Sequence, residues 1–109
     1  MSTPSQIIQE LHRLILQNEK GISALYDAEI TLADRESELD AIESKAFLSN
    51  SGSVADRQAI ARLEAGDARL KRDLAKAEMN RVKHKIRMIE QAMSASQTSA
   101  KMLDLESRL

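Results

Sequence analysis

The 109-residue chain has no cysteine and no tryptophan, and it contains only one proline, three glycines, one tyrosine and one phenylalanine. Without cysteine it forms neither disulfides nor thiolate metal sites. A β-sandwich or an α/β enzyme of this length normally carries more aromatic and turn residues. A core with so few rings has to be built from Leu, Ile, Ala and Met, which favours elongated helices and burial by a second subunit.

Long apolar runs are absent as well. The opening sequence MSTPSQIIQE has no basic region followed by a long apolar run, so it does not resemble a signal peptide. No apolar run approaches the roughly 20 residues that are needed to span a bilayer. We therefore expect a soluble, cytoplasmic protein.

The residues that are abundant, Ala, Leu, Glu, Lys, Arg, Ser and Ile, are typical of long helices. Thr3 as cap and Pro4 at the first helical position predict a helix from about residue 4 to about residue 48. Its apolar residues recur at steps of three and four, and Gly21 should not end it. The stripe consists of Ile8, Leu11, Ile15, Ile22, Leu25, Leu32, Leu39 and Ala46, widened by Leu14, Ala28 and Ile42 and interrupted by Asn18, Glu29, Glu36 and Glu43. This imperfect heptad pattern indicates packing on more than one neighbour.

The stretch AFLSNSGSVADRQAIARLE, residues 46–64, breaks the rhythm. Residues 49–53 are turn formers, and Gly52 or Asn50 can adopt the left-handed conformation that stops a helix. Ser53 followed by Asp56 is typical of a capped helix start. We expect a tight reversal here rather than a domain boundary, because neither half can bury its apolar stripe alone.

The second helix should run from about residue 54 to about residue 93, with a local stutter near residues 74–86. Residues 94–109 form a tail that is either helical or frayed. The apolar stripe of this helix consists of Ile60, Leu63, Leu70, Leu74, Ala77, Val82, Ile86, Ile89, Met93, Ala100 and Leu103.

The sequence therefore predicts an all-α fold. Residues 1–109 form a single domain, a long antiparallel helical hairpin of the coiled-coil type, with helices of about 44 residues and roughly 66 Å each. The width of the apolar stripes predicts dimerisation into a four-helix bundle. The predicted oligomer seam comprises Ile15, Ile22, Leu25, Leu32, Leu70, Leu74, Val82, Ile86 and Ile89.

Charge is divided between the halves, with a net charge of 4 − 9 = −5 over residues 1–48 and 10 − 6 = +4 over residues 54–93. If the turn is centred near residue 50, residues 81–87 lie beside residues 14–20, where Glu19 is the one acid. This leaves a possible basic contact patch made of Arg81, Lys83, His84, Lys85 and Arg87. Such a patch suits phosphates or an acidic protein. Because no aromatic residues are interleaved for base stacking, a solvated face is favoured over a nucleic-acid site.

Sequence motifs of catalysis are missing. The chain has no HExxH, no glycine-rich phosphate loop and no nucleophile elbow. In the hairpin, residue 12 would lie opposite about residue 89, so His12 and His84 would approach within about two helical turns, but surface histidines are the favoured interpretation. No Glu-x-x-His pair supports a di-metal bundle. We expect no enzyme, no catalytic residues, no metal and no cofactor.

The segment from Glu43 to Ala100 resembles small coiled-coil proteins of tailed phages and prophages, which are often encoded near early recombination genes. The similar feature is an Ala/Lys-rich end of the first helix, a short turn, and GSVADR opening an Ala-rich second helix, here Ala46 to Arg57. The resemblance implies a phage or prophage origin, hence the host cytoplasm, and a role beside DNA-processing proteins. It implies no catalytic residues.

The favoured function is a phage-encoded, homodimeric protein-interaction module that binds and modulates, by inhibition or bridging, a host or phage protein. Candidate contacts are the turn at residues 50–56, the tail at residues 102–109 and the basic patch. One alternative is a DNA-associated accessory factor in phage recombination. Another is a structural or secretion-type coiled-coil component.

Overall fold

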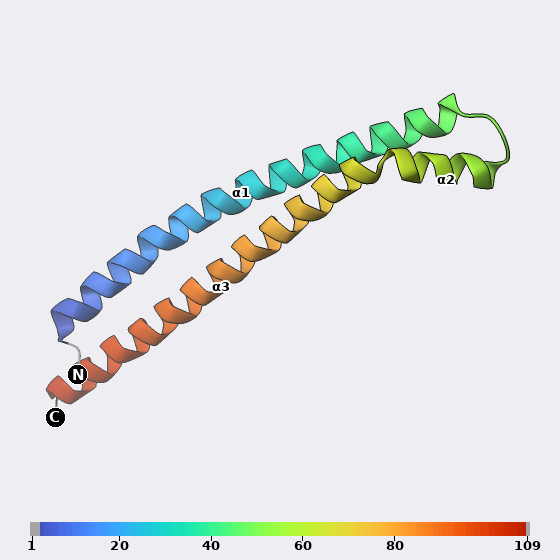
Figure 1. Ribbon diagram of the computed structural model, residues 1–109. Coiled ribbons are helices and arrows are strands. Elements are labelled where there is room, and N and C mark those ends of the chain that lie inside the picture. The colour runs from blue at the N-terminus through green and yellow to red at the C-terminus, as the bar shows by residue number, and fades with distance from the viewer. Residues whose placement is uncertain (1–2, 109) are drawn as a thin grey trace. The chain divides into compact units, whose positions relative to one another are not determined.

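The computed structural model describes residues 3–108, which are all-α and contain no strand (Figure 1). Helix α1 (Pro4–Ser49) is followed by a reversal, and α2 (Val54–Glu64) and α3 (Gly66–Arg108) return along it. The predicted helical hairpin is confirmed.

Helix α1 begins with a reciprocal cap. The backbone N–H of Thr3 donates to Gln6 Oε1 at 2.9 Å, and the N–H of Gln6 donates to Thr3 Oγ1 at 3.2 Å. This exchange satisfies two of the amide groups that a helix start leaves without an intrahelical acceptor. Pro4 occupies the first helical position, where no N–H is needed. The predicted start is confirmed.

The reversal also has its predicted chemistry. Gly52 has φ +113°, a backbone conformation that L side chains rarely adopt. Ser53 Oγ accepts from the N–H of Asp56 at 3.1 Å and caps α2. Arg57 then ties the two helices together, since its Nε donates to the carbonyl of Phe47 at 3.0 Å and its guanidinium lies 4.2 Å from the centre of the Phe47 ring.

The returning helix differs from the prediction of a continuous helix, because Ala65 separates α2 from α3. Ala65 has φ −87° and ψ 7°, but its N–H donates to Ala61 O at 3.0 Å and its carbonyl accepts from the N–H of Arg69 at 2.9 Å. The helical hydrogen bonds therefore continue across the junction. Beyond it, α3 remains helical to Arg108, through the segment where fraying had been one expectation.

The described residues form two compact units, each an antiparallel helix pair. Unit 1 combines residues 3–25 with residues 81–108, and unit 2 is Tyr26–Asn80. The buried apolar residues of unit 1 are Ile7, Leu14, Val82 and Ile89. In this unit Gly21 lets the two helices approach closely, because a Cβ at this position would lie only 2.9 Å from Cγ1 of Ile86.

The core of unit 2 is made mostly of alanine. Leu39 of α1 packs with Ala65 and Ala68, and Ala65 is fully buried. The other buried residues of this unit are Ala28, Ala46 and Ala61. Small side chains along both helices allow the backbones to lie close together.

On each helix, the positions that are buried or half-buried against the opposite helix recur at steps of mostly alternating three and four residues. We call these positions the intramolecular seam. On the returning helices these steps continue without the predicted stutter. On α1 the seam contains Ile7, Leu11, Leu14, Asn18, Gly21, Leu25, Ala28, Leu32, Arg35, Leu39, Glu43 and Ala46. On α2 and α3 it contains Ala61, Ala65, Ala68, Arg72, Ala75, Met79, Val82, Ile86, Ile89, Met93, Ser96, Ala100 and Leu103.

The seam corrects part of the predicted apolar stripes. Seven large residues of the predicted stripes are exposed instead, namely Ile8, Ile15, Ile22, Ile42, Leu63, Leu70 and Leu74. Ala77, Glu29 and Glu36, which were placed on the same stripes, are exposed as well. For the three leucines of unit 2 the reason is steric, since close backbone packing selects alanine over larger apolar side chains that hydropathy ranks more highly. In unit 1 large residues are buried, and the neighbouring Ile7, Leu14 and Gly21 take the covered positions instead of Ile8, Ile15 and Ile22.

The predicted register is also corrected. Residues 81–89 share a groove with residues 17–24 rather than lying beside residues 14–20, and Gly21 faces Ile86. One cause is that the connection between the helices, residues 50–53, is centred beyond residue 50. The packing of Leu39 on Ala65 and Ala68 sets the rest of the offset.

Candidate interaction surfaces

Three exposed leucines of unit 2 share one face of the returning helices. Leu63, Leu70 and Leu74 are exposed to 83%, 58% and 62%. At 100° per residue they lie on the face opposite the alanines that contact α1. We call these three residues the outer leucine stripe. It crosses the junction at Ala65, and none of its residues is among the buried residues of unit 2.

A second exposed row lies on α1 in unit 1. Ile8, Ile15 and Ile22 recur every seventh residue and are exposed to 67%, 44% and 56%. They follow one edge of the intramolecular seam, which itself is filled by Ile7, Leu14 and Gly21. We call them the isoleucine row.

The nine residues of the predicted oligomer seam therefore divide into two groups. Five of them, Leu25, Leu32, Val82, Ile86 and Ile89, lie in the intramolecular seam. The other four, Ile15, Ile22, Leu70 and Leu74, remain open to solvent. The second group is the part of the prediction that an additional partner can still cover.

The predicted basic patch does not lie on one face of α3. Arg81 and Lys85 follow one edge of the intramolecular seam, Lys83 and Arg87 follow the other, and His84 lies on the outer face. Arg81 and Lys85 share a groove of about 360 Å³ with Lys20 of α1. Sequence reasoning missed Lys20, because the pairing of α1 with α3 was predicted in a different register.

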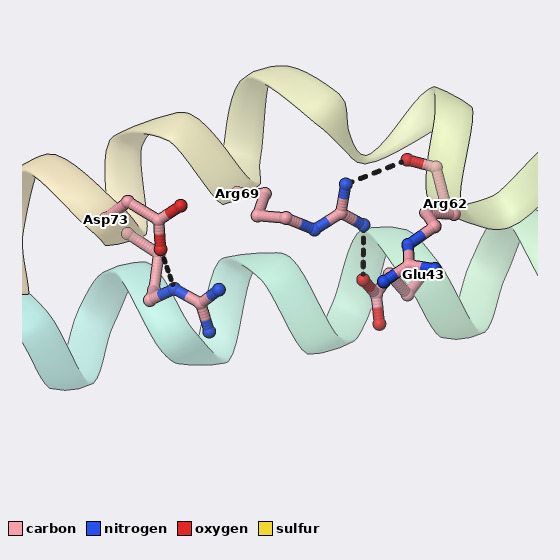
Figure 2. A network of polar contacts seen from close by, with 5 residues as sticks. Glu43, Arg62, Arg69 and Asp73 are labelled. Carbon is pink, nitrogen blue, oxygen red and sulfur yellow. Dashed lines mark hydrogen bonds and ion pairs between the residues drawn. The ribbon is translucent and has the colours of Figure 1, made fainter.

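A wider groove of about 650 Å³ lies near the turn in unit 2. Figure 2 shows the polar network beside it: Arg69 Nη2 lies 3.0 Å from Glu43 Oε1, and Arg69 Nη1 donates to the carbonyl of Arg62 at 3.3 Å. The Arg69 and Glu43 side chains are 28% and 41% exposed, so this ion pair contributes at most about 1 kcal/mol. The groove is lined by Glu43, Ser44, Phe47, Leu48, Gln58, Ala61, Arg62 and Arg69.

Among the described residues, the titratable groups with a shifted pKa include Glu10 and Arg13. The hydrogen bond from Arg13 lowers the pKa of the Glu10 carboxyl, and the same contact raises the pKa of Arg13. Both groups are on the surface. Within residues 3–108 no three His, Asp or Glu side chains gather to hold a metal ion.

The two histidines are both exposed and are further apart than predicted. With Gly21 facing Ile86, residue 12 lies opposite about residue 95 rather than residue 89. His12 and His84 are therefore separated by about three helical turns along the pair, so the structure does not bring them together.

None of the helices in the described part of the chain is long and apolar enough to cross a membrane. The chain matches no protein-family model, no curated protein and no solved structure.

Proposed function

We propose that this protein is a non-enzymatic interaction module that binds a helix of another protein through its exposed apolar rows. The observation that carries the proposal is the outer leucine stripe. Its three leucines recur at helical spacing, yet alanines on the opposite face of the helix already fill the contact with α1. Apolar residues at this spacing on an open helix face suit pairing with an amphipathic helix.

The biological setting is a further part of the proposal and rests on the resemblance of residues 43–100 to coiled-coil proteins of phages. In that setting the protein is phage-encoded, acts in the host cytoplasm, and inhibits or bridges a host or phage protein. The turn at residues 50–56 lies outside the stripe and offers polar contacts around it. In the tail, residues 102–108 offer Met102 and Leu105, exposed to 60% and 62%; Leu109 lies outside the described residues.

The test compares the wild-type chain with a Leu70→Glu/Leu74→Glu variant as bait in host lysate. The matched control, Asn80→Glu/Gln91→Glu, adds the same charge at exposed polar positions of α3 outside the stripe. A protein retained by wild type and control, and at least tenfold less by the leucine variant, is identified, purified and titrated in a direct binding assay. Equal retention by all three baits, or loss of the difference with the purified partner, would contradict the proposal.

A second candidate function, a DNA-associated accessory factor, draws on one specific observation. Lys20 joins Arg81 and Lys85 around one groove, and these cations come from two helices. Contacts of this kind to phosphates weaken steeply as salt is raised. This function predicts that a short labelled DNA binds at low salt and is released at high salt, and that Lys20→Glu/Lys85→Glu binds it more weakly. Absence of any shift at low salt, with single- and double-stranded DNA, would exclude it.

A further inference from the structure

We propose that the outer leucine stripe pairs with the same stripe of a second copy of this chain, in antiparallel orientation and centred near residue 68. This inference rests on the proposed function, because it names the first partner of the surface described there. The occupant follows from how the apolar and charged residues are placed along α2 and α3.

Two of the three leucines are placed symmetrically about the proposed centre. When two copies of the stripe run in opposite directions about a point between residues 68 and 69, Leu63 of each copy lies opposite Leu74 of the other. Leu70 lies between these two layers, next to the two-fold axis and opposite Asp67 of the other copy. The pairing is self-complementary, as a two-fold symmetric interface requires.

Charge selects the antiparallel orientation. Glu64 and Lys71 lie on the same edge of the stripe, and in this register Glu64 of each copy faces Lys71 of the other, so the pair forms twice. Asp67 lies nearer the axis, within reach of the same lysine. A parallel pairing would place Lys71 beside Gly66 and Glu64 beside Ala59, where neither finds an opposite charge.

The side chains of these edges are available for a second copy. Glu64, Asp67 and Lys71 are exposed, and none of them forms an ion pair with another residue of the described chain. Their charges are therefore not already neutralised by closer contacts within the helix pair.

The accessible surface of the chain is larger than that of a compact monomer of the same mass. The chain exposes 8190 Å² for a mass of 12.1 kDa, whereas a compact monomer of this mass exposes about 6,000 Å². The chain therefore exposes about 2,000 Å² more than such a monomer. A specific interface of standard size removes about 800 Å² from each partner.

The test is a charge swap read by sedimentation equilibrium. Wild type is expected to be dimeric, and Glu64→Lys and Lys71→Glu should each weaken the dimer at least tenfold, because each replaces two attractive pairs with repulsive ones. Mixing the two variants should restore association, since one then carries lysine and the other glutamate at both positions. The Glu64→Lys/Lys71→Glu double variant should dimerise by itself.

Two controls keep the result interpretable. Lys76→Glu changes the same charge on α3 away from the stripe and should dimerise like wild type, and circular dichroism verifies that every variant stays helical. Since the chain has no cysteine, a mixture of Leu63→Cys and Leu74→Cys chains reports orientation: antiparallel pairing gives crosslinks between the two variants. Crosslinks of Leu63→Cys mainly to itself would indicate a parallel pair and overturn the proposal.

The failure of this inference is distinguishable from failure of the proposed function. A wild-type chain that stays monomeric at all protein concentrations, or single charge variants that dimerise as well as wild type, would overturn self-pairing at this stripe. If the Leu70→Glu/Leu74→Glu variant still lost a purified heterologous partner, the proposed function would stand while the second copy was excluded.

Discussion

At the scale of single residues, Gly21 shows how one position sets the distance between two helices. Glycine costs about 1 kcal/mol relative to alanine in a helix interior, yet the chain carries it in the middle of α1. The structure gives the reason, since a Cβ here would lie 2.9 Å from Cγ1 of Ile86. The loss of helix propensity is exchanged for close packing.

This exchange predicts that the effect of Gly21→Ala on the free energy of unfolding has opposite signs in the wild-type chain and in an Ile86→Ala chain. Gly21→Ala should lower the free energy of unfolding in the wild-type chain, where the new methyl group displaces Ile86. In an Ile86→Ala background the same substitution should raise it by up to about 1 kcal/mol, because only the helix propensity remains. Urea denaturation of the four chains measures both values. A Gly21→Ala chain more stable than wild type would show that Ile86 moves aside at little cost.

Asn18 is a polar residue at a position of the intramolecular seam. It is half-buried, and its Oδ1 is buried without a hydrogen-bond partner among the described residues. A polar residue at a seam position costs stability and helps specify register. We predict that Asn18→Leu raises the free energy of unfolding by about 1 kcal/mol, measured in urea, with Gln17→Leu on an exposed position as control. Destabilisation by Asn18→Leu would mean that the amide makes a favourable contact, for example through water.

At the scale of elements, α2 depends on its cap more than the longer helices do, because it spans only Val54–Glu64. Its start is satisfied by Ser53 Oγ, which accepts from the N–H of Asp56. Ser53→Ala should lower the free energy of unfolding by about 1 kcal/mol, the usual loss for a removed N-cap.

The control for this prediction is Ser51→Ala, which alters an exposed serine of the same loop that caps no helix. The two variants are compared by thermal and urea denaturation followed at a helical signal. If the two substitutions changed the free energy of unfolding equally, the cap formed by the Ser53 hydroxyl would make no contribution of its own to stability.

The helix junction at Ala65 illustrates how an element carries two surfaces. On one face, alanines at 61, 65 and 68 pack toward α1; on the other, the outer leucine stripe remains exposed. Smaller residues thus form the intramolecular contact, and the larger ones are left for another chain. A ranking of residues by hydropathy would instead predict that the leucines are buried against α1 and that the alanines are exposed.

At the scale of the whole molecule, little of the chain is fully buried. The buried residues of the described chain include no large side chain below 2% exposure, and the accessible surface is 8190 Å². Stability that depends on a second copy rises with protein concentration by mass action. We predict that the midpoint of thermal unfolding increases over a hundredfold range of concentration and that Leu70→Glu/Leu74→Glu abolishes the increase. A midpoint independent of concentration would indicate that the hairpin reaches its full stability alone.

Much of the fold could be predicted from the sequence, because its signals are local. The cap at Thr3, the positive φ of Gly52, the cap at Ser53 and the helical spacing of apolar residues all act within a few positions of the chain. The basic residues of the candidate patch were likewise identified by composition, but the prediction could not say that they lie around α3 rather than on one face.

By itself the sequence determined that this chain is helical, where it reverses and how its charge is divided, since propensity, capping and turn chemistry depend on near neighbours. Only the tertiary structure decided the register of α1 against the returning helices and which apolar residues meet. Leu63 and Ala65 both suit a buried helix face, and the choice between them rests on how closely two backbones approach. That distance depends on pairs such as Leu39 with Ala65, which lie far apart in sequence and which no local pattern reports.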